Sequence, residues 1–295
     1  MDLIKLFEKA KNVKLVDKNT ISLIEKQRVG GFLSDVLNDN TLGKQAGECV
    51  LFGAPSGQGK TTYTLMEINH SIQLGKKVFF YVTESDLSDI LIELCKINNI
   101  DDDEDKRKEF INSISDNLIL YYDQYDPSVV RTIMEDMNFD EFYIDYLDSS
   151  IVSAQTAAEK STILNNCVRF MIECGKEFHK FVWINVQAKL SLYQEYSMDS
   201  YRESTALGNA ATICLINHRN RSANKDDNGH SLDSEMQSDS VIDIIKLRHS
   251  CVYAGVGTKI FYNFKYNNKY QYTEIGHSQD GEVMEERKRT PFSEW

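Results

Sequence analysis

The stretch Ala54-Pro55-Ser56-Gly57-Gln58-Gly59-Lys60-Thr61 follows an apolar run at 49–54 and leads into a helical pattern that begins at Lys60. It fits the Walker A pattern GxxxxGK(S/T) if alanine replaces the first glycine. Glycines let backbone N–H groups curl around phosphates, and the N-terminus of the following helix adds partial positive charge. The sequence therefore predicts a phosphate-binding loop, with the candidate residues Ala54, Pro55, Ser56, Gly57, Gln58, Gly59, Lys60, Thr61 and Thr62.

A nucleoside triphosphate site needs a cation and a second carboxylate in addition to this loop. Lys60 is expected to neutralise the β- and γ-phosphates, and the hydroxyl of Thr61 is expected to bind Mg²⁺. The apolar run 142–144 ends in Asp145, which would hold the water shell of the same ion. Asp148 is a weaker alternative because it lies further into the following loop. ATP and Mg²⁺ are therefore the predicted cofactors.

Apolar β-rich runs alternate with helical patterns over most of the chain. Strands are expected at 49–54, 77–82, 117–122, 142–147 and 181–186, and helices from residue 60 and at 86–98, 127–136 and 157–178. Further strands, without long helices between them, are expected at 211–217, 239–248, 258–265 and 269–274. This order predicts an α/β fold with a mostly parallel central sheet that ends in antiparallel strands.

The composition excludes several classes of protein. The 295 residues include 33 lysines and arginines against 45 acidic residues, a net charge of −12, so the surface as a whole cannot attract nucleic acid. Any DNA must meet a local site such as a loop or channel. The cysteines and histidines show no spacing typical of a zinc site or a disulfide framework. The chain has neither a long apolar stretch nor a signal peptide pattern, and a cytoplasmic protein without membrane contact is expected.

Composition also suggests how the chain is divided. Residues 1–28 resemble an arm of two helical segments ahead of the main domain at 29–276. The last segment, 277–295, is a charged tail that we expect to be flexible, and the polar stretch 219–238 is expected to be mobile as well.

Several motifs occur in order along the chain: Phe52-Gly53-Ala54-Pro55-Ser56, Val82-Thr83-Glu84-Ser85, Asp145-Tyr146-Leu147, Asp199-Ser200-Tyr201-Arg202-Glu203-Ser204 and Lys246-Leu247-Arg248. From Gly31 to about Asn267, this order resembles the RecA-like motor domain of DnaB-type replicative DNA helicases (superfamily 4), in the form found in bacteriophages. The resemblance implies a RecA-like P-loop NTPase fold, and it is far more specific than the phosphate loop alone.

The resemblance implies catalytic roles for four residues outside the phosphate loop. Glu84 would be the base that orients the attacking water, at the tip of a strand beside the phosphate-loop strand. Gln187 would sense the γ-phosphate from the end of the strand 181–186. Arg248, with Lys246 on the same strand face, would reach the γ-phosphate of a neighbouring subunit. The residues alone also allow a helix-capping role for Glu84 and solvated strand-end cations for Lys246 and Arg248.

Loops 148–157 and 188–201 follow strands at whose ends such motors expose their DNA-contacting loops. Only the glutamine of the family's Ser-Gln-Leu-Asn-Arg remains in Val186–Leu190, and His249–Tyr253 replaces an expected Asn-Gly-Pro run. Acidic neighbours of Lys189 make an ordinary surface loop an equal alternative to a DNA site. The candidate contacts for single-stranded DNA are Lys189, Tyr193, Tyr196, Tyr201 and Arg202.

Taken together, the residues and the resemblance predict an ATP-dependent replicative DNA helicase motor that forms a ring, expected to be hexameric, and translocates on single-stranded DNA. A primase or a helicase loader would be a further partner, and a phage protein would work in the host cytoplasm. The arm would dock on a neighbouring subunit through Leu3, Leu6 and Phe7, or pack on its own domain. The alternatives are a RecA-like recombinase filament and a nucleotide-gated adaptor or loader with little translocation.

Overall fold

The computed structural model describes residues 28–41, 43–100, 103–147, 156–191, 196–201, 206–220, 238–248, 257–266, 269–279 and 282–284. The predictions for residues 1–27, for most of the polar stretch 219–238 and for the segment after residue 284 lie outside this range.

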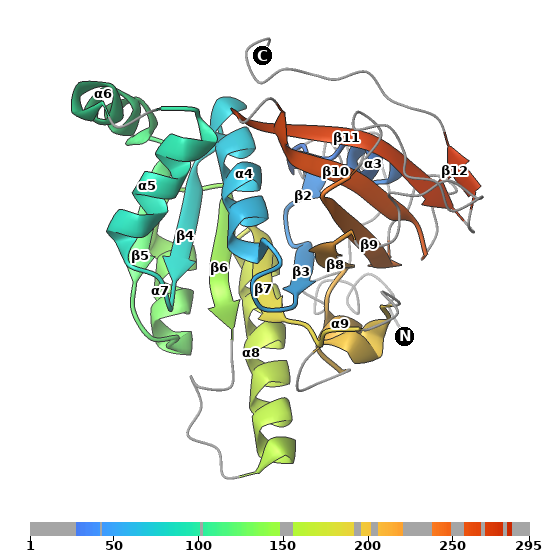
Figure 1. Ribbon diagram of the computed structural model, residues 1–295. Coiled ribbons are helices and arrows are strands. Elements are labelled where there is room, and N and C mark those ends of the chain that lie inside the picture. Colours follow the sequence, from blue (N-terminus) through green and yellow to red (C-terminus); the bar gives the residue numbers. More distant parts are fainter. Residues whose placement is uncertain are drawn as a thin grey trace, which may run out of the picture.

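A single large sheet forms the centre of the molecule (Figure 1). Within the described residues it has ten strands in the order β12-β11-β10-β9-β8-β3-β7-β6-β4-β5. The strands from β8 to β5 in this order are parallel, whereas β8 to β12 pair antiparallel. The parallel strands are β3 (Cys49–Ala54), β4 (Val78–Val82), β5 (Leu118–Tyr122), β6 (Glu141–Leu147), β7 (Phe181–Gln187) and β8 (Ile213–Arg219). This arrangement confirms the predicted fold class.

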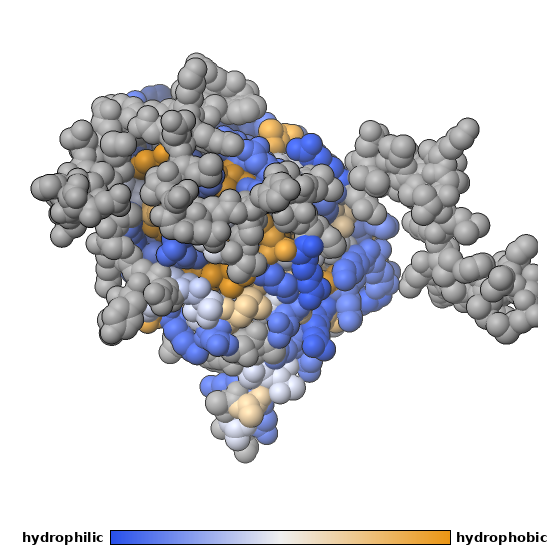
Figure 2. Space-filling view, turned by 90° about the vertical axis from the view of Figure 1, so that its right-hand side faces the viewer, coloured by the Kyte–Doolittle hydropathy of each residue, from blue (hydrophilic) through white to orange (hydrophobic). Residues whose placement is uncertain are grey.

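The antiparallel end of the sheet extends further along the chain than the sequence predicts. It consists of β9 (Ser240–Leu247), β10 (Lys259–Tyr266), β11 (Lys269–Gln279) and β12 (Glu282–Met284). Pairing of β11 with β12 therefore carries the sheet past residue 276, where the tail was expected to begin. Figure 2, which views the molecule from this side, shows hydrophobic residues in the middle of the face and hydrophilic residues around them.

Helices cover both faces of the sheet, because alternate residues of the buried strands point to opposite sides. On one face, Val50 and Phe52 pack with α3 (Asp35–Asn40), α4 (Lys60–Gln73) and α5 (Leu87–Ile97). On the other, Cys49 and Leu51 pack with α7 (Pro127–Asp136), α8 (Ala157–Glu177) and α9 (Ala206–Ala210). The remaining elements are α6 (Glu104–Ile114), the short pair β1 (Arg28–Gly30) and β2 (Lys44–Gln45), and the 3₁₀ turn η2 (Met198–Ser200). The sequence predicts none of these four elements, and it does not predict α3 or α9 either.

A fully buried lysine joins three of these elements. The Nζ of Lys44 on β2 lies 2.8 Å from Glu67 Oε1 on α4 and 3.0 Å from Glu141 Oε2 on β6. It also donates to Ser71 Oγ at 2.6 Å and to the hydroxyl of Tyr143 at 2.9 Å. Burial alone would lower the pKa of Lys44, but the two carboxylates outweigh it and raise the pKa above its ordinary value of 10.5. The lysine is therefore charged at neutral pH and holds α4 against β6.

Replacing Lys44 by alanine should destabilise the fold by about 3–5 kcal/mol at neutral pH, because two carboxylates would stay buried without a cation. Urea unfolding followed by circular dichroism measures the loss. The matched control Lys77→Ala removes an exposed lysine and should change the free energy of unfolding by less than about 0.5 kcal/mol. Similar small changes for both variants would contradict a stabilising role for the cluster.

Candidate functional site

The phosphate-loop sequence forms the expected connection between a buried strand and a helix. β3 ends at Ala54 and α4 begins at Lys60, with Gly59 as the N-cap residue. Gly57 and Gly59 have φ of 70° and 83°, a left-handed conformation that costs glycine little. A Cβ on Gly59 would also come within 3.1 Å of the Phe264 ring. Both the backbone and the close approach of Phe264 therefore require glycine at position 59.

The structure brings Lys60, Thr61 and Asp145 together. The Nζ of Lys60 donates to Asp145 Oδ1 at 2.8 Å, and the hydroxyl of Thr61 donates to Asp145 Oδ2 at 2.6 Å. Asp145 is buried, and the Lys60 ammonium lies 3.9 Å from the centre of the Tyr146 ring. A carboxylate and a hydroxyl at the start of a helix are oxygen ligands of the kind that Mg²⁺ prefers. These residues fit a magnesium ion beside a phosphate chain.

Gln187 and Glu84 lie at the same edge of the sheet, because the carboxyl ends of parallel strands meet there. Gln187 is half-buried and pairs in register with Ala54 on the phosphate-loop strand. Glu84 is exposed and follows β4, whose last residue, Val82, pairs with Asp145. The expectation that β4 lies beside the phosphate-loop strand is wrong, since β7 and β6 lie between β3 and β4. Glu84 is thus a neighbour of Asp145 rather than of the loop itself.

Lys246 and Arg248 lie at the opposite edge of the sheet. β9 runs antiparallel to β8, so Lys246 pairs with Cys214 near the start of β8. Ser240, at the other end of β9, is near the phosphate loop, and the strand rises about 3.3 Å per residue. Lys246 is therefore roughly 20 Å from this end along the strand. Neither cation is close to the phosphate loop of its own chain.

The Nζ of Lys246 donates to the backbone carbonyls of Gly208, Asn209 and Ala211 at 2.6, 3.1 and 2.8 Å. An ammonium has three donors, so these bonds use all of them. Arg248 is exposed and donates from one Nη to the Asn209 carbonyl at 2.6 Å. Burial lowers the pKa of Lys246, and Arg248 lowers it further. Both side chains thus cap the C-terminus of α9, where cations are favourable.

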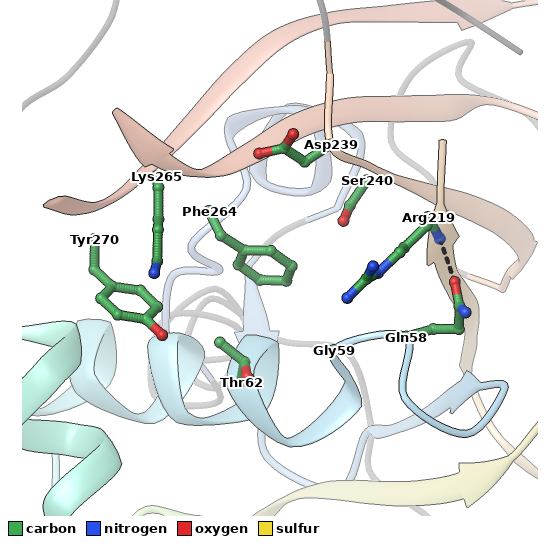
Figure 3. A pocket seen from close by; sticks show the side chains of 9 residues that line it. All are labelled: Gln58, Gly59, Thr62, Arg219, Asp239, Ser240, Phe264, Lys265 and Tyr270. Atoms are coloured by element: carbon green, nitrogen blue, oxygen red, sulfur yellow. Dashed lines mark hydrogen bonds between the residues drawn. The ribbon is translucent and has the colours of Figure 1, made fainter. Parts of the chain in front are cut away.

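A pocket of about 330 Å³ lies beside the phosphate loop, between the N-terminus of α4 and strands β8 to β11 (Figure 3). The Phe264 ring lies over Gly59 and Thr62, and Lys265 and Tyr270 form the adjoining wall (Figure 3). The Lys265 ammonium is 4.4 Å from the Tyr270 ring centre. The lining consists of Gln58, Gly59, Thr62, Arg219, Asp239, Ser240, Phe264, Lys265 and Tyr270.

Most lining residues of this pocket were missed by sequence reasoning. Gln58 joins the loop to the end of β8, because its Oε1 accepts from Arg219 N at 2.8 Å and its backbone carbonyl accepts from Asn217 Nδ2 at 2.7 Å. Phe264 and Tyr270 come from antiparallel strands far along the chain, where aromatic residues are ordinary strand formers. Only the order of the strands brings these residues to the loop.

The candidate DNA contacts are only partly described. Tyr193, Arg202 and most of loop 148–157 lie outside the described residues. Lys189 is exposed and donates to the Asp199 carbonyl at 2.9 Å, and the Tyr196 ring packs 4.7 Å from His218. Tyr201 is fully buried, and its hydroxyl contacts the carbonyls of Leu51 and Leu215 at 3.3 and 3.2 Å. Its prediction as a DNA contact is wrong, because this tyrosine packs in the core.

Comparison with known proteins rests on structure alone. No family model matches the sequence, and no curated protein matches it. A DnaB-like replicative helicase, described together with its interactions with primase, matches with a TM-score of 0.63 and 18% identity over 91% of this chain and 69% of that chain. A second solved structure, an ATPase domain, matches with a TM-score of 0.62 and 17% identity over 88% of this chain and 99% of that one. The chain therefore has the RecA-like fold of DnaB-type motor domains.

Two features are absent from the part of the chain that the structure describes. None of the helices there is long and apolar enough to cross a membrane. Nor does this part of the chain hold a group of three or more His, Cys, Asp or Glu side chains that could bind a metal ion.

Lys246→Met should reduce the free energy of unfolding by about 1–3 kcal/mol, because the carbonyls at the end of α9 lose their donor while the half-buried position keeps its bulk. Arg248→Met removes an exposed donor and should cost less than about 1 kcal/mol. Urea unfolding of both variants beside wild type distinguishes the two side chains. Equal losses would show that Lys246 is not the main cap of α9.

Proposed function

We propose that this chain is the ATP-dependent motor of a replicative DNA helicase, which assembles as a ring and translocates on single-stranded DNA. The observation that carries the proposal is the convergence of Lys60 and Thr61 on Asp145 at the carboxyl edge of a RecA-like sheet. The likeness in fold to a DnaB-like replicative helicase and to a second solved ATPase domain supports it. Ring formation, DNA binding and unwinding belong to the proposal.

ATP and Mg²⁺ fit the residues around the phosphate loop. The backbone of residues 54–62 would hold the phosphates, and Thr61 and Asp145 would hold Mg²⁺, which neutralises charge on the phosphates. Lys60 would exchange its bond to Asp145 for the phosphates, which frees the carboxylate for the ion. The adjoining pocket would take the nucleoside, with the Phe264 and Tyr270 rings available for stacking on the base.

Hydrolysis would use residues from the neighbouring strand ends. Glu84 would accept a proton from the attacking water, beside the ion held by Asp145. Gln187 would report the γ-phosphate to the following loop, since it pairs in register with Ala54 and lies two residues before Lys189. Lys189 would then contribute to the DNA-binding loop, together with Tyr193 and Arg202.

Arg248 would act on the nucleotide of a neighbouring subunit. Its strand end lies opposite the phosphate loop of its own chain, so a second copy must bring a loop to it. The bond to Asn209 occupies one of the five guanidinium donors, whereas Lys246 is fully used in capping α9. We therefore assign the transition-state contact to Arg248 and a positioning role to Lys246. Single-stranded DNA and other copies of this chain would be the main partners, and a primase or a loader a further one.

Lys60→Ala should abolish ATP hydrolysis and unwinding of a forked duplex, because the charge that neutralises the β- and γ-phosphates is lost. Its fold should persist, since Lys60 contacts the site rather than the core. Phosphate release and strand separation are measured beside wild type, with circular dichroism as the control of folding. Normal turnover by the folded variant would remove the phosphate-site assignment, and hydrolysis by wild type without unwinding would favour an adaptor.

Mixing two inactive variants tests the role of Arg248 in a neighbouring subunit. Lys60→Ala and Arg248→Ala chains should each hydrolyse ATP poorly, and mixed rings would contain some sites with Lys60 from one chain and Arg248 from the next. Partial recovery of ATPase activity is expected across a range of mixing ratios. Subunit exchange is confirmed by native mass spectrometry. If subunits exchange but activity does not recover at any ratio, Arg248 acts on the nucleotide of its own chain or takes no part in hydrolysis.

A further inference from the structure

The outer wall of the nucleotide pocket is the end of a β-hairpin. Phe264 and Lys265 come from β10, and Tyr270 from β11, where it pairs with Lys265. The wall stands above the first turn of α4 (Figure 3). Its position relative to α4 therefore decides how well the pocket fits a nucleoside.

The side chain of Asn99 holds this wall from outside the hairpin. Its Nδ2 donates to the Tyr270 carbonyl at 2.9 Å, and its Oδ1 accepts from the Tyr270 backbone N–H at 2.8 Å. A side-chain amide that pairs with both backbone groups of one residue acts as a neighbouring strand would. Asn99 follows the C-cap of α5 and has φ of 57°. The two bonds thus attach the end of α5 to β11 at the pocket.

Glu93 on α5 adds a third point of attachment. Its Oε1 accepts from the Tyr270 hydroxyl at 3.3 Å. Burial and the nearby Glu93 raise the pKa of Tyr270, so the hydroxyl keeps its proton and can donate at neutral pH. Tyr270 is therefore held both at its backbone and at its hydroxyl, and the Lys265 ammonium lies over its ring. Free rotation of this wall residue is restricted before any ligand binds.

We propose that Asn99 is a positioning residue, which holds Tyr270 and the β10–β11 wall in place for the nucleoside part of ATP. This inference rests on the proposed function, because it presumes that ATP binds at the loop and pocket. The phosphates would be held by residues 54–62, which Asn99 does not contact. Losing the attachment should therefore weaken binding of the nucleoside and leave binding of the phosphate chain unchanged.

The test uses the full chain with Asn99→Gly, because glycine tolerates a positive φ and removes only the side-chain amide. Asn99→Asp is the second variant, since it keeps the shape but cannot donate to the Tyr270 carbonyl. His179→Gly is the matched control, an exposed residue with φ of 56° outside the pocket. Calorimetry measures binding of Mg-ATP and of inorganic tripolyphosphate with Mg²⁺, and steady-state assays measure KM and kcat.

Both Asn99 variants should raise Kd and KM for ATP by roughly 3- to 10-fold, with kcat and the Kd for tripolyphosphate unchanged. His179→Gly should alter none of these values. Unchanged ATP binding by Asn99→Gly, or an equal loss for ATP and tripolyphosphate, would overturn the positioning role. Failure of the wild-type chain to bind either ligand would instead overturn the proposed function.

Discussion

The carboxylate of Asp145 accepts hydrogen bonds from both Lys60 and Thr61, and this contact ties the end of β6 to the first turn of α4. It can form only because β3, β7 and β6 are parallel and end at one edge of the sheet. The glycines of the loop then turn the chain from β3 back over that edge. Loop, helix start and carboxylate are therefore one unit, into which an ion and a phosphate chain fit.

The buried Lys44 cluster holds the same two elements at their other ends. Glu67 and Ser71 belong to the second half of α4, and Glu141 begins β6. Thr61 and Ser71 lie ten residues apart on α4, a distance of about 15 Å along the helix. Glu141 and Asp145 lie four residues apart on β6, about 13 Å along the strand. The two sets of contacts are therefore similarly spaced on both elements. Asn99, just after α5, attaches the β10–β11 hairpin wall to this part of the fold, because α5 packs in the same core as α4.

Short-range patterns predicted much of this structure. The loop around Lys60 and the strand that carries Asp145 could be predicted, because their signals depend on neighbours in the sequence. The place of β4 in the sheet could not be predicted in this way, because strand order follows from long-range packing. β4 lies beside β6, and Glu84 is therefore a neighbour of Asp145. Tyr201 lay among polar residues yet is buried in the core. A Lys-x-Arg pattern cannot show that the Lys246 ammonium donates its hydrogen bonds to backbone carbonyls at the end of α9. The roles of Phe264 and Tyr270 in the pocket could not be predicted, because these residues reach the phosphate loop only through the folding of distant strands.

In the proposed function, nucleotide turnover in this fold is coupled to single-stranded DNA within a ring. The most direct test measures the ATPase rate of the wild-type chain with and without single-stranded DNA, alongside its native mass under the same conditions. We expect DNA to increase turnover and the mass to correspond to a closed ring of several chains. A DNA-independent rate from a monomer, or an open filament of unlimited length, would contradict the claim.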